Sequence, residues 1–223
     1  MSSTPPARYA VTPRTTPSRN RDRMRYDRET VHAILDADFI CHLAFVSPDG
    51  APVALPMLYA RVGDSLYLHG STGSRPMRDA AEGLRVCATV TRTDGLVLAR
   101  SGVHHSINYR SVVAHGTAYR VTDPGEHRTA LDAIIDHLIP ERSADCRPAT
   151  AKELAQTAVL RLDLEEVAAK ARTGGVSDEP EDIDLPYWAG VIPITRTLGT
   201  PVPDPGMPTE TPVPAYLRRL VQS

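Results

Sequence analysis

Apolar runs of strand length follow one another along the middle of this 223-residue chain, and tight turns rather than helices join most of them. The clearest hairpin signal is Asp49-Gly50, which lies between runs 39–46 and 53–62 and matches the residue preference of a β-hairpin turn. No helix alternates regularly with the runs, which argues against a doubly wound parallel sheet and favours a small antiparallel barrel with added helices. The further runs are 65–71, 85–92, 95–102, 108–121 and a returning strand at 158–164.

Two local signals interrupt these runs. Thr93-Asp94-Gly95 predicts a turn that would divide 85–92 from 95–102. Pro56 lies inside the run 53–62, and a proline cannot donate a ladder hydrogen bond. We therefore expect a strand edge at Pro56, or a place where the ladder is open to a ligand.

Helices are predicted around the strands. The strongest signal lies at 122–140, where Asp123 can cap the helix, Pro124 suits its first position and Glu126 completes a capping box. Pro140 should end this helix. The other helices are expected after an N-cap at Asp27, at 77–84 and at 150–156.

Two arms flank the predicted domain at 26–194. Residues 1–25 are rich in Arg, Pro, Ser and Thr and are predicted to be a disordered basic arm, while the Pro-rich residues 195–223 are predicted to form an extended arm. The first 28 residues hold seven arginines against two aspartates, yet the whole chain has a net charge of −2. That overall charge argues against a protein that binds nucleic acid.

The three cysteines form no close pair, as expected of a reduced intracellular protein. No apolar stretch approaches the roughly 18 residues that a membrane span needs, and the first residues do not resemble a signal peptide. We therefore expect a cytoplasmic protein without a membrane partner.

Residues 70–76, with the sequence GSTGSRP, form a polar bend between a strand and a helix. Three hydroxyl groups, two glycines and the guanidinium of Arg75 all donate hydrogen bonds or let a donor approach, and an arginine can hold a phosphate with two parallel bonds. The bend is therefore either a phosphate site or an ordinary polar connection. No dinucleotide or P-loop fingerprint is present.

The bend and later motifs resemble the FMN-binding split-barrel superfamily of the pyridoxamine 5′-phosphate oxidases. In those oxidases a Thr-Asn-x-Gly-Ser-Arg-Lys type stretch grips the FMN phosphate, and a later strand begins Arg-Gln-Val and runs to Gly-x-Ala. Here Gly73-Ser74-Arg75 matches the first motif, and Arg110-Ser111-Val112 with Gly116-Thr117-Ala118 matches the second. The segments LYLHGS, GLVLARS, NYRSV and WAGVIP are most similar to shorter flavin-nucleotide-binding proteins related to the nitroimidazole-resistance proteins.

The resemblance implies a β-plus-α fold, a six-stranded antiparallel split barrel with flanking helices, and a homodimer that binds FMN between its subunits. It makes Arg75 the phosphate clamp. The hydroxyl partners of the phosphate would be Ser71, Thr72 and Ser74, and the flavin ring would lie on the backbone of Leu55, Pro56, Met57 and Leu58. Further candidate cofactor-binding residues are His69, His105, Tyr109, Arg110, Ser111, Lys170 and Trp188.

Three positions depart from the oxidase pattern. Ser111 stands where the oxidases place a longer glutamine, and Pro76 replaces a second basic residue of the phosphate grip. The arginine and histidine that bind pyridoxal phosphate in the oxidases have no match in the tail, so vitamin B6 oxidation is not predicted.

The predicted function is an FMN-dependent oxidoreductase acting on an unidentified small molecule, with His69 as the candidate catalytic residue. The alternatives are a flavin carrier or sensor without turnover, and a split barrel that binds haem or a deazaflavin. His104 and His105 do not predict a metal site, because neighbouring side chains in a strand point to opposite faces. Trp188, the only tryptophan, packs in the core or reaches the flavin of a partner subunit.

Overall fold

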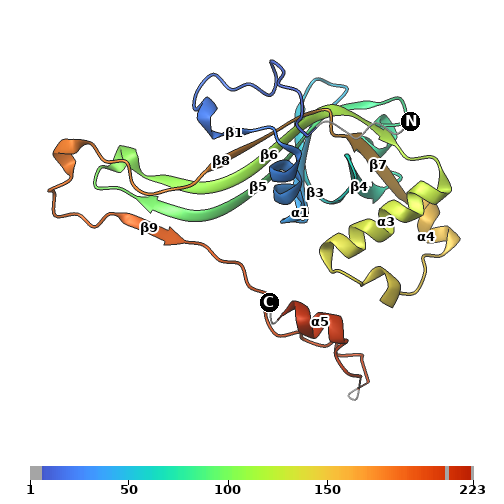
Figure 1. Cartoon of the computed structure of the whole chain (residues 1–223). Coiled ribbons are helices and arrows are strands. Elements are labelled where there is room, and N and C mark those ends of the chain that lie inside the picture. The colour runs from blue at the N-terminus through green and yellow to red at the C-terminus, as the bar shows by residue number, and fades with distance from the viewer. Residues whose placement is uncertain (1–6, 209–210, 222–223) are drawn as a thin grey trace.

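The computed structural model describes residues 7–208 and 211–221, and its strands form one nine-stranded antiparallel sheet (Figure 1). The strands are β1 (Met24–Arg25), β2 (Ile40–Val46), β3 (Pro52–Val62), β4 (Ser65–Ser71), β5 (Leu84–Leu98), β6 (Ser106–Arg120), β7 (Thr157–Asp163), β8 (Glu166–Arg172) and β9 (Gly190–Pro193). The order is β1-β8-β6-β7-β4-β3-β2-β5-β9, and a further pairing of β5 with β6 closes six strands, β2 to β7, into a ring. This confirms the predicted fold class.

The helices are α1 (Arg28–Asp36), α2 (Arg75–Asp79), α3 (Pro124–Leu138), α4 (Ala151–Gln156) and α5 (Ala215–Leu220). Short 3-10 helices lie at η1 (Arg21–Arg23), η2 (Gly102–His104), η3 (Ser143–Asp145) and η4 (Pro180–Asp182). The predicted N-caps of α1 and α3 are confirmed, because Asp27 accepts from the Thr30 amide and Asp123 from the Glu126 amide. None of the described helices is long and apolar enough to cross a membrane.

The predicted turn at Thr93-Asp94-Gly95 is wrong, because β5 runs through it without reversing. Thr93 pairs with Tyr109 and Gly95 with Asn108, so Asp94 is the extra residue of a β-bulge. An Asp-Gly pair suits a bulge as well as a turn, and here the long ladder with β6 decides between them. The sequence also missed β8 and β9, and α2 ends at Asp79 rather than continuing to residue 84.

Two apolar clusters lie on opposite faces of β4. Leu66 and Leu68 are fully buried inside the ring, together with apolar residues of α1. Tyr67 points the other way and packs with Ile134 of α3. Because side chains alternate along a strand, the next outward-facing residue of β4 is His69, on the same side as α3.

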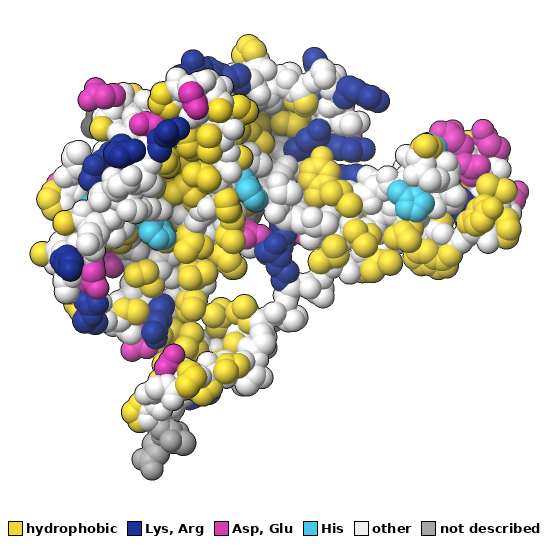
Figure 2. Space-filling view, turned by 180° about the vertical axis from the view of Figure 1, so that it is seen from behind, with side chains coloured by type: hydrophobic (Ala, Val, Ile, Leu, Met, Phe, Trp, Pro, Cys, Tyr) yellow, Lys and Arg dark blue, Asp and Glu magenta, His cyan; other side chains and the backbone are white. Residues whose placement is uncertain are grey.

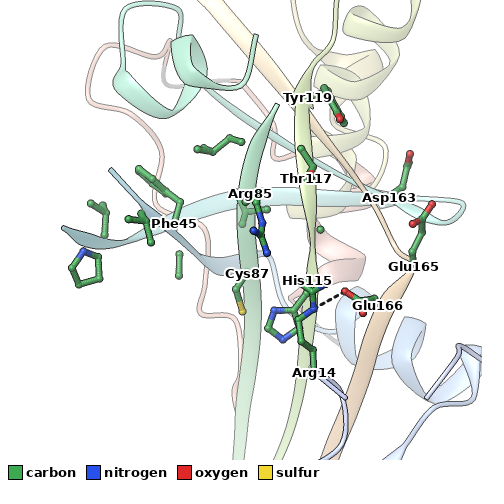
Figure 3. Close-up of a pocket in the computed structure, with 17 residues that line it drawn as sticks. Arg14, Phe45, Arg85, Cys87, His115, Thr117, Tyr119, Asp163, Glu165 and Glu166 are labelled. Atoms are coloured by element: carbon green, nitrogen blue, oxygen red, sulfur yellow. Dashed lines mark ion pairs between the residues drawn. The ribbon is translucent and has the colours of Figure 1, made fainter. Parts of the chain in front are cut away.

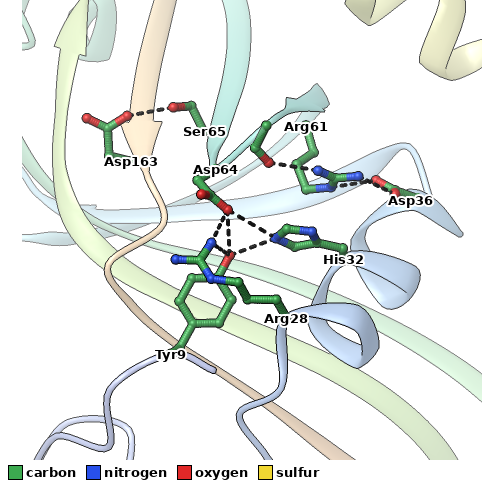
Figure 4. A network of polar contacts seen from close by, with 9 residues as sticks. Tyr9, Arg28, His32, Asp36, Arg61, Asp64, Ser65 and Asp163 are labelled. Carbon is green, nitrogen blue, oxygen red and sulfur yellow. Dashed lines mark hydrogen bonds and ion pairs between the residues drawn. The ribbon is translucent and has the colours of Figure 1, made fainter. Parts of the chain in front are cut away.

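The N-terminal segment differs from the disordered arm expected for residues 1–25, of which residues 1–6 lie outside the described part of the chain. Tyr9 is buried, and its amide donates to the Tyr26 carbonyl at 2.8 Å. Its hydroxyl lies 2.8 Å from Nε2 of His32 and donates to Asp64, which also pairs with Arg28 (Figure 4). This aromatic anchor fixes a segment whose composition alone indicates disorder.

The C-terminal segment leaves β9 as an extended chain and reaches α5 beneath the body (Figure 1). Arg196 forms an ion pair with Asp38 at 2.6 Å. The hydroxyl of Tyr216 donates to Asp145 at 2.8 Å. The segment thus contacts the loop between α1 and β2 and the 3-10 helix η3 that follows α3.

Candidate functional site

The candidate site is a hollow that opens where β3 and β4 separate. The two strands pair only over residues 59–62 and 65–68; earlier residues of β3 pair with β2, and later residues of β4 pair with β7. The hollow has a volume of about 400 Å³. Its lining residues are Leu55, Pro56, Met57, Leu58, His69, Gly70, Ser71, Ser74, Pro76 and Met77.

The backbone nitrogen of Pro56 faces the open side of β3, where a missing ladder bond was expected. The Tyr59 amide donates to the Phe39 carbonyl on the β2 side. Amides alternate along a strand, so the amide that proline lacks at position 56 would point away from β2, towards the hollow. The β2 ladder therefore loses no hydrogen bond to Pro56, and the open edge presents backbone to a ligand.

The bend closes one end of the hollow. Ser74 precedes α2, and its amide donates to the Ser71 carbonyl at 2.9 Å. Gly70 leaves room for Met77, since a Cβ there would lie 2.7 Å from the Met77 methyl carbon. Thr72 does not join the hollow, because its amide and hydroxyl both donate to the Gln156 carbonyl of α4.

Arg75 lies at the start of α2 with an exposed side chain and has no hydrogen bond or ion pair to any described residue. It does not line the hollow itself. The pKa of Asp49 is lowered by a hydrogen bond from Ser47 and, to a smaller extent, by the charge of Arg75. The exposed guanidinium, without a partner among the described residues, is available to a ligand.

His69 borders two hollows. Besides the site between β3 and β4, it lines a second hollow of about 540 Å³ under α3 and α4. Its Nδ1 atom is buried and has no hydrogen-bond partner, and burial lowers the pKa of the ring. The imidazole is thus favoured in its neutral form.

Four predicted site residues lie on the β6–β8 ladder, away from the bend. Arg110 binds Asp94 through two bonds of 2.8 Å. Ser111 pairs with Lys170, and its hydroxyl donates to the Lys170 carbonyl at 3.3 Å. Tyr109 continues the same ladder. One chain does not bring these residues to the hollow.

His105 and Trp188 lie near the end of the arm that the β5, β6, β8 and β9 strands form. His105 is exposed and its Nδ1 lies 3.1 Å from the Ser101 carbonyl. Trp188 is 66% exposed, so core packing is the wrong interpretation of this residue. Its ring covers Gly190, where a Cβ would lie 2.8 Å from the indole.

A larger concavity of about 1140 Å³, which no sequence motif indicated, lies against β2, β5 and β6. Arg14 forms an ion pair with Glu166 at 3.0 Å, and His115 lies beside them (Figure 3). Strand pairing places Cys87 opposite His115. Strands that are distant in the sequence form this surface together. The alternation of residues within one strand can indicate which of its side chains face outward, but not which strands lie beside it.

This chain is similar to a known family and to several solved structures. The family model described as pyridoxamine 5′-phosphate oxidase matches residues 27–171. The flavocytochrome Anf3 of Azotobacter vinelandii is 38% identical over 94% of this chain and 97% of its own, with a TM-score of 0.87. An FAD and haem binding protein of Mycobacterium smegmatis is 39% identical over 89% of this chain and 97% of its own, with a TM-score of 0.84.

A 5-nitroimidazole antibiotic resistance protein of Bacteroides thetaiotaomicron shares the fold at 20% identity, covering 66% of this chain and 85% of its own with a TM-score of 0.56. Among curated proteins, none matches the chain.

Proposed function

Because the chain belongs to the pyridoxamine 5′-phosphate oxidase family, we propose that it is a flavoprotein that binds FMN between β3 and β4 and oxidises or reduces a small molecule. One observation carries this proposal: the strands separate where the open backbone of residues 55–58 faces the hydroxyls of Ser71 and Ser74. Arg75 stands beside this opening without a partner among the described residues.

The residues in the hollow and beside it would have separate tasks. Ser71, Ser74 and Arg75 would hold the phosphate, since hydroxyls and a guanidinium are strong donors to it. The open edge of residues 55–58 would support the ring. A bound flavin supplies the electron transfer, and the protein supplies binding and orientation.

FAD is the alternative nucleotide, because the name of the M. smegmatis relative states FAD. FAD carries the FMN phosphate within a longer ligand, so both would use the same bend. A carrier without turnover would bind the flavin equally well, and assays with NAD(P)H and an electron acceptor separate it from an enzyme.

We also propose a homodimer. Tyr109, Arg110, Ser111 and Lys170 lie on a projecting arm, away from the hollow of their own chain. A second copy would allow such an arm to reach a site. The arm also exposes apolar side chains, which single chains rarely leave open as a continuous patch.

Arg75→Ala tests the phosphate site. The substitution removes a charge-assisted contact, so we expect FMN affinity to fall by about 30- to 150-fold, or roughly 2–3 kcal/mol. Riboflavin, which lacks the phosphate, should bind both proteins alike. Fluorescence titration of the two ligands gives both affinities.

Arg78→Ala is the matched control, since Arg78 is also exposed on α2 but lies outside the bend of residues 70–76. It should bind FMN as the wild type does. Equal FMN affinity in wild type and Arg75→Ala would contradict the phosphate assignment. FAD titrated in parallel shows which nucleotide the site prefers.

A further inference from the structure

A basic hollow lies between the N-terminal segment and the projecting arm. Its volume is about 330 Å³, at the lower end of the roughly 300–1,000 Å³ that small-molecule sites occupy. Three arginines line it, namely Arg23, Arg25 and Arg172. It shares no lining residue with the hollow between β3 and β4, so it is a separate site.

Strand pairing builds the N-terminal wall of the basic hollow. β1 lies beside the end of β8 (Figure 1), with Met24 opposite Lys170 and Arg25 opposite Ala169. Arg25 donates from Nη1 to the carbonyls of Asp22 and Met24, at 2.6 and 2.8 Å. These bonds hold the guanidinium beside the 3-10 helix η1. Its Nε and Nη2 atoms have no partner among the described residues and are left for a ligand.

The loop after β8 forms the opposite wall and is held at several points. Asn108 and Arg172 donate to the two glycine carbonyls of residues 174–175, at 2.9 and 3.1 Å. Asp178 then accepts from the amide and the guanidinium of Arg100, at 2.9 and 2.8 Å. Both walls are therefore fixed before a ligand arrives, which lowers the entropy cost of binding.

The charges around the basic hollow are unbalanced. Arg25 and Arg172 donate to carbonyl and amide oxygens rather than to carboxylates, and the Arg23 side chain has no partner among the described residues. Asp22 is the one acidic residue on the described lining, so three positive charges and one negative charge leave a net charge of +2. A phosphomonoester carries about −1.5 to −2 at pH 7, and arginine forks bind it through paired hydrogen bonds.

The rest of the lining indicates what the phosphate is attached to. A phosphate group alone fills only part of this volume. Thr173 and Ser177 add hydroxyl groups, and the apolar lining residues are the small Ala171 and Val176. Hydroxyls can exchange hydrogen bonds with a hydroxyl-rich body, whereas an aromatic or alkyl body would find few apolar partners here. A sugar suits this lining.

We propose that the basic hollow binds a phosphorylated sugar, with Arg23, Arg25 and Arg172 holding the phosphate and the neighbouring hydroxyls meeting those of the sugar. The ligand is either a free sugar phosphate or the phosphorylated ribose of a nucleotide, since both carry the same dianion and hydroxyls. The N-terminal segment thereby supplies two of the three arginines. This inference does not rest on the FMN proposal.

Isothermal titration calorimetry of the whole chain with ribose 5-phosphate tests the proposal. Arg23→Ala should weaken binding by about tenfold or more, because a charge-assisted contact is lost while no contact of that side chain within the described fold is removed. Arg19→Ala is the matched control, since Arg19 is exposed on the same segment but does not line the hollow. It should bind as wild type does, and ribose without a phosphate should bind at least tenfold more weakly.

NADPH and NADH distinguish the two sources of the ligand, because only NADPH carries a phosphomonoester on a ribose. NADPH that binds more tightly than both NADH and ribose 5-phosphate, and loses this advantage in Arg23→Ala, identifies a nucleotide. Tighter binding of ribose 5-phosphate than of NADPH identifies a free sugar phosphate.

Several outcomes overturn the proposal. They are the absence of ribose 5-phosphate binding to wild type, equal affinity in wild type and Arg23→Ala, and inorganic phosphate that binds as tightly as ribose 5-phosphate. Arg75→Ala separates this site from the flavin site: it should keep its affinity for ribose 5-phosphate, while Arg23→Ala keeps its affinity for FMN. Loss of ribose 5-phosphate binding in Arg75→Ala alone would assign the sugar phosphate to the bend and also overturn the proposal.

Discussion

At the scale of single residues, Asp94 shows how a bulge can serve a sheet. The extra residue of β5 turns its carboxylate to Arg110 of the neighbouring strand, and both nitrogen–oxygen distances are 2.8 Å. The hydrogen bond from Arg110 lowers the pKa of Asp94 from its ordinary value of 3.8. The pair therefore fastens the arm at the point where the ladder shifts register.

Asp94→Asn should lower the free energy of unfolding by about 0.5–1 kcal/mol at neutral pH, the order of a partly exposed ion pair. Because the folded-state pKa is depressed, the contribution is full above the unfolded-state value of 3.8 and is lost as the pH falls through the lower folded-state pKa. Urea unfolding of both proteins across this window measures it. A difference that persisted below both pKa values would contradict this origin.

At the scale of elements, α3 packs against the sheet with one face and lines the second hollow with residues of the same helix. Its Ala130 and Ile134 are buried against β3, β4 and β7, while Ile135 faces the hollow. Glu126 in its first turn accepts a bond of 2.7 Å from Tyr67, whose pKa is raised to about 12 by burial and by this carboxylate. The start of the helix is thus tied to β4.

The N-cap of α3 should contribute about 1 kcal/mol to the free energy of unfolding, because Asp123 accepts from an amide that has no partner within the helix. Asp123→Ala should lose this amount in urea denaturation. Asp123→Ser keeps an acceptor and should recover most of it. If both substitutions cost the same, the cap bond is not the cause.

At the scale of the whole molecule, the arm that β5, β6, β8 and β9 form projects from the body. Figure 2 shows it projecting from the body with hydrophobic side chains gathered along it. Leu96 pairs directly with Ile107 on β6 and with Ile192 on β9, so the three form a stripe across neighbouring strands. All three are more than 40% exposed. Such a stripe suits a second copy of the chain.

We expect light scattering to give twice the 24.2 kDa of one chain. Leu96→Asp places a charge in the proposed interface and should raise the dimer dissociation constant by about tenfold or more. Val62→Asp is the control, since Val62 is 41% exposed against 43% for Leu96 but lies on the β3–β4 hairpin. A monomer in wild type, or equal dissociation in both variants, would contradict the homodimer.

The sequence by itself determined the features that depend on neighbouring residues. Asp49-Gly50 makes a hairpin because the turn geometry needs those residue types, and Asp27 and Asp123 cap helices through amides three positions away. Pro56 marked the open strand edge because a proline has no backbone N–H to donate to a neighbouring strand. The bend at residues 70–76 and its hydroxyl groups could also be located from the local sequence, because small polar residues and glycines separate a strand-like run from a helix there.

Tertiary structure decided what depends on partners far along the chain. The same Asp-Gly signal became a turn at Asp49-Gly50 and a bulge at Asp94-Gly95, because only the ladder with β6 distinguishes them. Trp188 is exposed because it lies in the loop before β9, the edge strand of the sheet. His69 borders two hollows because α3 folds back over β4. Contacts between such distant segments arise from closure of the sheet, and no local pattern of residues encodes them.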